Sequence, residues 1–206
     1  MPTILLIRHG ENEYTRTQRL AGRLPNAHLN ERGRAQAAAL AEALKGVPLK
    51  AIYSSPLERA VETAQPIARL HGLRVQKRPG LIETDLGSWQ GQSIKKLQRN
   101  KEWKLLQEHP SRFRFPGGEW MAEQQSRLVT EIESLCALHT TRAVIACVGH
   151  ADPIKLIIAH YVGMPLDLFQ RLNIDTASIS TLALEKGRAK LINLNWKPEN
   201  KDIKSV

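Results

Sequence analysis

Two short apolar runs, each followed by a histidine, constrain the fold of this chain more than any other feature. Residues Ile4–Ile7 lead directly into Arg8 and His9, and Val144–Val148 lead within two residues into His150. A strand that is covered on both faces of a parallel sheet is continuously apolar, so both runs are predicted to be buried strands. Ligands of open α/β sheets bind in the crevice beyond the carboxyl ends of the strands. Both histidines are therefore placed where a ligand is expected.

The rest of the chain alternates predicted strands with predicted helices. The strands are expected at Thr3–Ile7, Ala51–Tyr53, Leu73–Gln76, Ala143–Val148, Ser178–Leu184 and Lys190–Leu194. Strands that alternate with helices indicate a parallel sheet covered by helices. We therefore predict an α/β fold, namely a three-layer α/β/α sandwich with a mostly parallel central sheet.

Capping residues predict where the helices begin. Asn30 is suited to cap a helix that runs to Leu44. The segment Ser55–Glu58 has the form of a capping box with proline at the first helical position, which predicts a helix from there to about Leu70. Asp152 followed by proline predicts another helix start of the same kind.

Length and composition favour one domain. A chain of 206 residues with 42% hydrophobic residues fits a single domain with a buried core. We expect one α/β domain at residues 1–196 and a basic tail at residues 197–206. Residues 93–123 are the least regular stretch, because prolines and glycines interrupt two short helices there, and we interpret this segment as a lid. A long helix is predicted at about Met121–His139.

Composition also excludes several classes of protein. Cys136 and Cys147 lie in apolar-periodic segments, so two buried reduced thiols are expected rather than a disulfide or a zinc site. The first apolar stretch is shorter than the roughly 7–15 residues of a signal peptide core, and no stretch approaches the ~18 apolar residues of a membrane span. The sequence therefore predicts a cytoplasmic protein with no membrane partner.

The formal net charge of +10 has three explanations. It is consistent with a solvated basic surface, with an anionic small substrate or with nucleic acid. The basic residues are spread along the chain and do not accompany an aromatic RNA-binding motif, which makes nucleic acid the least favoured partner. The other two explanations remain open.

Five residues near predicted strand ends have the chemistry of phosphoryl transfer: Arg8, His9, Arg59, Glu83 and His150. Arginine forks bind phosphate oxygens, and Arg59 lies in the first turn of a predicted helix, where unpaired backbone N–H groups favour an anion. A histidine nitrogen can attack phosphorus, and a carboxylic acid can protonate the leaving oxygen and then activate water. Two histidines and a carboxylate could also bind iron or zinc, but Arg8 and Arg59 would repel a dication at short range.

These residues lie in a series of motifs that resembles the histidine phosphatase superfamily, also called the phosphoglycerate-mutase-like family. The matching segments, in chain order, are Leu6–Glu11, Leu29–Gly33, Tyr53–Ala60 with Glu62–Ala64, Leu81–Gly91 and Val148–His150. An Arg-His-Gly tripeptide alone is a weak signal, whereas several motifs in the right order are a strong one. The resemblance extends over about residues 3–184.

The resemblance implies a metal-independent phosphatase and a role for each residue. His9 would be the nucleophile that becomes phosphohistidine, and Glu83 would be the acid and then the base. Arg8, Arg59 and His150 would hold the phosphoryl oxygens. No metal or organic cofactor is expected, and the partner would be a small phosphorylated metabolite. Family members often pair, so a homodimer is also compatible with the resemblance.

The chain departs from the family pattern at the mouth of the pocket. It has Asn12 where Ser or Thr is usual, and Thr15 where Asn is common. The predicted substrate-binding residues are Asn12, Thr15, Ala21, Gly22 and Ala151. The differences lie at the mouth of the pocket, so the core reaction is expected to be retained. The identity of the substrate stays open, because these positions would contact it.

Three functions are compatible with these motifs: a phosphatase for small phosphomonoesters, a phosphoglycerate-type phosphomutase, and a non-catalytic phospholigand-binding protein. Glu83 and His150 are 67 residues apart. Similar mutases usually have a longer insertion there, which shields the phosphoenzyme from water, so the shorter spacing favours hydrolysis.

The basic residues of the lid have two interpretations. They are Lys95, Lys96, Arg99, Lys101, Lys104, Arg112 and Arg114. They could favour substrates with a further negative charge, or they could form a solvated helix face.

Overall fold

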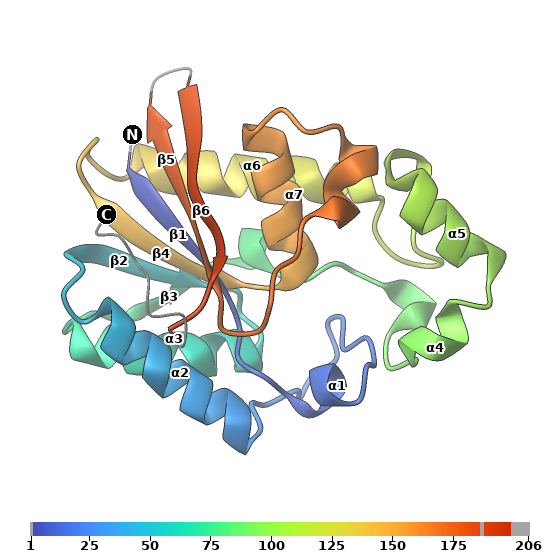
Figure 1. Cartoon of the computed structure of the whole chain (residues 1–206), viewed down its shortest axis with the longest axis horizontal. Helices are drawn as coiled ribbons and strands as arrows, with labels where there is room; N and C mark the ends of the chain where they lie inside the picture. The colour runs from blue at the N-terminus through green and yellow to red at the C-terminus, as the bar shows by residue number, and fades with distance from the viewer. Residues whose placement is uncertain (1, 186–187, 199–206) are drawn as a thin grey trace.

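A six-stranded sheet forms the centre of the computed structural model, which describes residues 2–185 and 188–198 (Figure 1). The strands are β1 (Thr3–Arg8), β2 (Leu49–Ser54), β3 (Val75–Lys77), β4 (Val144–Gly149), β5 (Ile179–Glu185) and β6 (Arg188–Trp196). Their order in the sheet is β3-β2-β4-β1-β5-β6. β1 to β4 are parallel, and β5 runs antiparallel to both β1 and β6. The predicted mostly parallel sheet is confirmed.

Helices on both faces of the sheet complete the three layers. The longer helices are α2 (Glu31–Leu44), α3 (Glu58–Leu70), α6 (Met121–Ala137) and α7 (Ala151–Tyr161). In Figure 1, α2 and α3 cover one face and α6 and α7 cover the other. The shorter elements are α1 (Glu13–Arg16), α4 (Ile94–Leu97), α5 (Lys101–Glu108) and the 3₁₀ helices η1 (Pro79–Leu81), η2 (Gly87–Trp89), η3 (Pro110–Arg112) and η4 (Leu166–Arg171). α1, α4 and α5 lie together at one end of the sheet (Figure 1).

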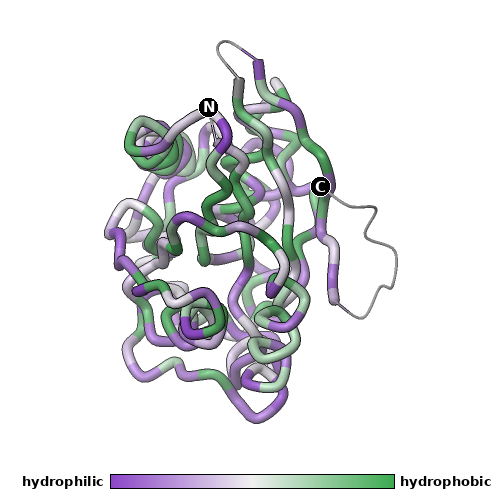
Figure 2. Tube along the Cα trace, turned by 90° about the vertical axis from the view of Figure 1, so that its left-hand side faces the viewer, coloured by the Kyte–Doolittle hydropathy of each residue, from purple (hydrophilic) through white to green (hydrophobic). Residues whose placement is uncertain are grey.

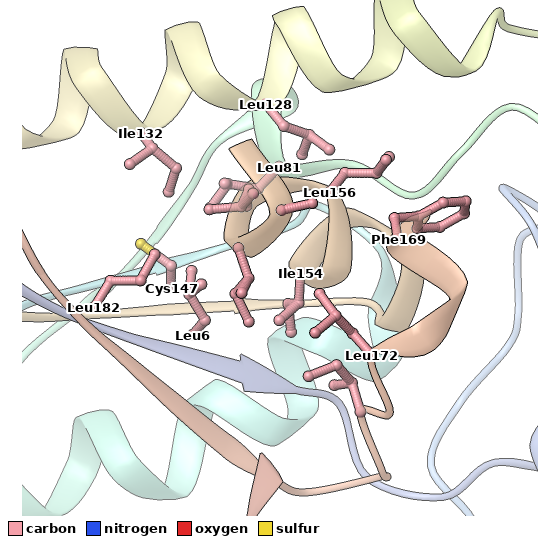
Figure 3. Close-up of a cluster of buried hydrophobic side chains, with 14 of the residues drawn as sticks. Leu6, Leu81, Leu128, Ile132, Cys147, Ile154, Leu156, Phe169, Leu172 and Leu182 are labelled. Carbon is pink, nitrogen blue, oxygen red and sulfur yellow. The ribbon is translucent and has the colours of Figure 1, made fainter. Parts of the chain in front are cut away.

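The apolar core lies on both faces of the sheet. Successive side chains of a strand point to opposite faces. Leu6 of β1 and Cys147 of β4 therefore pack beneath Ile132 of α6 (Figure 3), whereas Leu5 and Ile7 pack on the side of α2 and α3. Figure 2 shows the hydrophobic residues concentrated along the central strands and the hydrophilic residues along the peripheral loops. This pattern explains why β1 and β4, which are covered on both faces, contain continuous apolar runs.

Of the capping predictions, the one for α2 is correct and the one for α7 is not. The prediction for α2 is confirmed, because the side chain of Asn30 accepts a hydrogen bond from the Gly33 N–H at 2.8 Å. The prediction for α7 is wrong by two residues: the helix begins at Ala151 with His150 as its N-cap residue, and Asp152 lies inside the first turn.

The capping box predicted at Ser55 is also wrong. α3 begins at Glu58, and its N-cap residue, Leu57, makes no side-chain cap. The hydroxyl of Ser55 instead lies 2.8 Å from Nε2 of His150. The physical reason is that β2 ends beside β4, where a ring nitrogen competes with the helix for the same hydroxyl.

The remaining boundary predictions differ by small amounts. β3 begins at Val75, two residues later than predicted. Cys136 and Cys147 are buried free thiols, as predicted. The predicted basic tail lies outside the described residues from position 199 onward. None of the helices that the structure describes is long and apolar enough to span a membrane.

The sheet topology creates a crevice at the end of β1 and β4. These strands are neighbours, yet α2 after β1 and α7 after β4 lie on opposite faces (Figure 1). A crevice opens at such a reversal, outside the carboxyl ends of the strands. The register pairs Arg8 with Gly149. The next residue of each strand, His9 and His150, therefore emerges into the same crevice.

Close backbone packing at Gly33 holds the loop that follows β1. A Cβ atom at Gly33 would overlap the carbonyl oxygen of Glu11, whereas a Cβ atom at Gly46 would meet nothing within 4 Å. Alanine is a better helix former than glycine by about 1 kcal/mol. We nevertheless expect Gly33→Ala to lower the free energy of unfolding by more than about 1 kcal/mol, because the overlap involves backbone atoms. Gly46→Ala is the control and should be neutral or slightly stabilising. Urea unfolding of both variants checks this, and equal stability would contradict it.

Candidate active site

His9 follows β1, and its imidazole is held in the neutral form. Its Nδ1–H donates to the carbonyl oxygen of Gly10 at 2.7 Å, so we assign the lone pair to Nε2. The Nε–H of Arg59 donates to this Nε2 at 3.2 Å. Burial lowers the pKa of His9 well below its usual value, and the charges of Arg59 and Arg8 lower it further. An uncharged imidazole with a directed lone pair can attack phosphorus at neutral pH.

Thr63 joins the two elements that carry His9 and Arg59. Its Oγ1 accepts a hydrogen bond from the Gly10 N–H at 3.0 Å and donates to the carbonyl oxygen of Arg59 at 2.7 Å. The loop after β1 is thereby tied to the first turns of α3. This tie keeps the imidazole and the guanidinium group at a constant separation.

Two guanidinium groups lie near the imidazole, that of Arg59 fully buried and that of Arg8 partly buried. Arg59 is fully buried and donates from Nη2 to the carbonyl oxygen of Gly22 at 2.8 Å. Arg8 donates from Nη1 to the carbonyl oxygen of Ile174 at 2.6 Å. Within the described part of the chain, Nε of Arg8 and Nη1 of Arg59 are buried without a hydrogen-bond partner. Buried donors are rarely left unpaired, so both are suited to bind an anion.

His150 enters the site from the end of β4. Its ring centroid lies 5.2 Å from that of His9. The Oγ of Ser55 accepts from the Leu57 N–H, so its own hydrogen is available for Nε2 of His150, and we assign the imidazole proton to Nδ1. Burial and the nearby guanidinium groups lower the pKa of this histidine well below its usual value. Among the described residues its Nδ1 has no hydrogen-bond partner, and it lies 3.6 Å from Oε2 of Glu83.

Glu83 follows η1, and its two oxygens have different environments. Oε1 accepts from the backbone N–H of Thr84 at 2.9 Å and from its hydroxyl at 3.3 Å. Oε2 lies 4.0 Å from Nη2 of Arg59. Burial raises the pKa of Glu83 to about 7; Arg59 opposes this shift and Asp152 adds to it. The carboxyl group can therefore both give and take a proton near neutral pH.

A polar network supports the loop that carries Glu83. Gln124 of α6 is fully buried and donates from Nε2 to Oγ1 of Thr84 at 2.6 Å. Arg23 donates from Nε to the carbonyl oxygen of Glu83 at 2.8 Å and from Nη2 to Glu119 at 2.9 Å. These contacts hold the backbone at Glu83 and, through Thr84, its carboxyl group.

The structure brings all the sequence-predicted site residues together. They surround a pocket of about 370 Å³. Those that line it are Arg8, His9, Asn12, Thr15, Ala21, Gly22, Arg59, Glu83 and Ala151. His150 is fully buried against the ring of His9. No motif-based candidate lies elsewhere in the molecule.

Asn12 and Thr15 differ in what they can offer a substrate. The side-chain oxygen of Asn12 accepts from the Thr15 N–H at 2.8 Å, and the Thr15 hydroxyl donates to the carbonyl oxygen of Asn12 at 2.9 Å. The hydroxyl is thus already engaged. In contrast, Nδ2 of Asn12 is buried and has no partner among the described residues. It is the fourth unpaired donor of the site, after those of Arg8, Arg59 and His150.

Residues 93–123, the segment interpreted as a lid, present uncharged side chains to the pocket. The lining residues of this segment are Ile94, Trp103, Leu106, Gln107 and Phe115. The seven basic residues of the lid are all exposed, and none of them lines the pocket. Their placement fits the solvated-surface interpretation and does not support the expectation that they select for a further negative charge.

Several lining residues were not identified from the sequence. Besides those of the lid, they include Arg19 and Gln170. These two belong to no motif and reach the pocket through tertiary packing, Arg19 from the loop after α1 and Gln170 from η4. Asp152, which the family pattern places at the mouth of the pocket together with Ala151, also lines it. The described residues contain no group of three or more His, Cys, Asp or Glu side chains that could hold a metal ion.

Comparison with known proteins gives a consistent result. The sequence profile of the histidine phosphatase superfamily (branch 1) matches residues 4–197. Phosphoserine phosphatase 1 of Hydrogenobacter thermophilus is 32% identical over 197 residues, which are 95% of this chain and 92% of that protein. A 2,3-bisphosphoglycerate-dependent phosphoglycerate mutase of Thermoplasma acidophilum is 31% identical over 191 residues, which are 91% of this chain and 90% of that protein.

A solved structure shows the same similarity in three dimensions. The mycobacterial glucosyl-3-phosphoglycerate phosphatase in complex with VO3 superposes with a TM-score of 0.87 at 28% identity. The match covers 95% of this chain and 99% of that one.

The raised pKa of Glu83 makes stability depend on pH. Between about pH 4.5 and 7 the unfolded chain releases the proton while the folded chain keeps it, so stability falls as pH rises. We expect the free energy of unfolding to fall from pH 5 to pH 8 by on the order of 2 kcal/mol more in the wild type than in Glu83→Gln, which cannot titrate. Denaturant unfolding at both pH values measures this difference. A parallel pH dependence in the two proteins would show that the carboxyl pKa is not raised.

Proposed function

The chain belongs to the histidine phosphatase superfamily, as its motifs predict, and on this premise we propose that it works through a phosphohistidine at His9. It is a phosphoric monoester hydrolase. Its relatives are named for phosphoserine and for glucosyl-3-phosphoglycerate, so we propose small phosphomonoesters as the substrate class. The observation that carries the mechanism is the convergence of unpaired, buried donors around a neutral imidazole.

In the first step, His9 takes the phosphoryl group. Nε2 attacks phosphorus, and the bond between phosphorus and the alcohol oxygen breaks. The protonated carboxyl group of Glu83 gives its proton to that oxygen, so the product leaves as a neutral alcohol. The free N–H groups of Arg8, Arg59 and His150 bind the phosphoryl oxygens, whose charge they stabilise in the transition state.

In the second step, water releases the phosphate. The carboxylate of Glu83 takes a proton from water, and the water oxygen attacks the phosphorus of phosphohistidine. The bond to Nε2 breaks, which returns His9 to its starting state and frees inorganic phosphate. No metal ion is required, because the arginines supply the positive charge.

The remaining pocket residues would position the substrate. We propose that Nδ2 of Asn12 is a further donor to the phosphoryl group, and that Thr15, Ala21, Gly22 and Ala151 shape the entrance by steric contact. Residues 93–123 would act as the lid of a single α/β domain. Closing water out of the pocket strengthens the electrostatic contacts inside it.

A phosphomutase is the main alternative function. It would form the same phosphohistidine and return the phosphate to a substrate instead of to water, and one relative is named as such a mutase. The non-catalytic alternative would bind phosphorylated ligands without turnover. Release of inorganic phosphate in the presence of a chelator distinguishes the hydrolase from both.

His9→Ala tests the nucleophile. We expect it to abolish phosphoenzyme formation and to lower phosphate release from a panel of phosphomonoesters by several orders of magnitude, because the covalent step is lost. His160→Ala is the matched control, since His160 is exposed on α7 and does not line the pocket. Rapid-quench labelling and phosphate release with chelator present are the measurements. Activity near that of the wild type in His9→Ala would refute the assignment.

Glu83→Gln tests the acid. We expect a much larger loss of kcat on alkyl phosphates than on p-nitrophenyl phosphate, because a good leaving group needs little protonation. The comparison of the two substrates within one variant controls for misfolding. Equal losses on both would mean that Glu83 has another role.

A further inference from the structure

Beyond the phosphoryl site, the pocket has an apolar wall. It consists of Leu20, Leu86, Ile94, Trp103, Leu106 and Phe115. Two of these are aromatic, and four come from the lid. Apolar and aromatic walls bind the body of a small ligand, while a few polar groups orient it. The volume of about 370 Å³ is large enough for a phosphoryl group together with such a body.

The aromatic part of this wall is held rigidly. Trp103 stacks on Trp89, with ring centroids 6.0 Å apart and planes 21° apart. Trp89 in turn packs against Phe113 and Phe115, at 5.5 Å each. Trp89 is buried whereas Trp103 is partly exposed and lines the pocket. A ring that is fixed before binding loses little conformational entropy when a flat group packs on it.

The helix that carries Trp103 turns its charges away from the pocket. Leu106 and Gln107 of α5 line the pocket, one helical turn from Trp103. Lys104 and Glu108 are exposed and form an ion pair at 3.7 Å. The inner face of α5 therefore offers a substrate apolar contact and one neutral amide.

The two remaining charged residues of the pocket lining, Asp152 and Arg19, do not favour a second anion. Asp152 lines the pocket and acts on Glu83 through space, raising the pKa of its carboxyl group. Of the pocket-lining residues, Arg19 is the one cation besides Arg8 and Arg59, and its Nε and Nη2 both donate to the carbonyl oxygen of Gly91, at 2.9 and 2.6 Å. Two nitrogens of the Arg19 guanidinium group are thus engaged with the backbone. Oδ1 of Asp152 lies 3.5 Å from Nζ of Lys155, but Lys155 does not line the pocket, so the charge that Asp152 presents to a ligand there is its carboxylate, which would repel an anion.

We infer that the substrate is the monophosphate ester of an uncharged alcohol with a flat apolar body, which packs against Trp103 and Phe115. Asp152 discriminates against a carboxylate or a second phosphate on the same molecule. This inference rests on the proposed phosphatase function, and it makes Trp103 and Asp152 specificity-determining residues.

Three primary-alcohol phosphates test it at a matched leaving group: butyl phosphate, 4-phenylbutyl phosphate and 5-phosphooxypentanoate. We expect kcat/KM for 4-phenylbutyl phosphate to exceed that for butyl phosphate by about tenfold or more, mainly through KM, because a phenyl ring is buried. We expect 5-phosphooxypentanoate to be several-fold poorer than butyl phosphate. Equal values for all three, or a preference for the carboxylate, would overturn the inference while the phosphatase function stands. If none of the three esters were hydrolysed, both the inference and the proposed phosphatase function would be overturned.

Variants of Trp103 test the apolar wall. The readout is the ratio of kcat/KM for 4-phenylbutyl phosphate to that for butyl phosphate, which a general loss of folded protein does not change. Trp103→Ala should bring this ratio close to one, and Trp103→Phe should keep most of it. Trp120→Ala is the control, since Trp120 is an exposed tryptophan of the lid outside the pocket lining. An unchanged ratio in Trp103→Ala would contradict the assignment.

Asp152→Asn tests the charge discrimination. It should raise kcat/KM for 5-phosphooxypentanoate relative to butyl phosphate several-fold at a constant pH. Glu123→Gln is the matched control, because Glu123 is also a carboxylate in the first turn of a helix but does not line the pocket. An unchanged relative rate in Asp152→Asn would remove Asp152 from the specificity determinants.

Discussion

The contact between Arg59 and His9 is the constraint on which the rest of the site depends. A guanidinium group that is fully buried has lost its hydration, and removing a charge from water is costly. The protein compensates this charge only in part, through the carbonyl oxygen of Gly22 and through Glu83 at 4.0 Å. The remaining donor directions suit a phosphoryl group, which carries the missing negative charge and more than one oxygen.

The same burial sets the protonation states of His9 and Glu83, the two groups that we propose to react. Low polarity disfavours the charged form of any side chain, so it lowers the pKa of His9 and raises that of Glu83. At neutral pH the histidine is therefore neutral, as a nucleophile must be, while a large fraction of the carboxyl groups keep the proton that the leaving oxygen needs. One physical cause thus prepares both the proposed nucleophile and the proposed acid, and the nearby guanidinium groups moderate the pKa shift of Glu83.

The sequence predicts the reacting end of the pocket much better than the other end. His9, Arg59 and His150 each follow a strand or begin a helix, so periodicity and chain order are enough to bring them to one edge of the sheet. Glu83 lies in a loop after η1, where only its motif identifies it. Ser55 shows the limit of such reasoning, because a hydroxyl before a helix can cap it or bind a ring nitrogen, and only the neighbouring strand decides between them. Trp103 and Gln170 reach the pocket through packing between distant segments, for which the sequence has no local signal.

The segment 93–123, which we propose as a lid, contacts the loop that carries Glu83, which we propose as the acid. Trp89 of η2 lies in the same loop as Glu83 and stacks on Trp103 of the lid. At the end of the lid, the Glu119 N–H donates to the carbonyl oxygen of Asp85, and the Asp85 N–H donates to the Glu119 carboxylate at 3.1 Å. These contacts connect residues 93–123 to the loop of Glu83 at two separate points. If the apolar wall contacts the substrate and Glu83 protonates it, as we propose, these two groups keep one relative arrangement, and an ester that fills the wall is held with its oxygen toward Glu83.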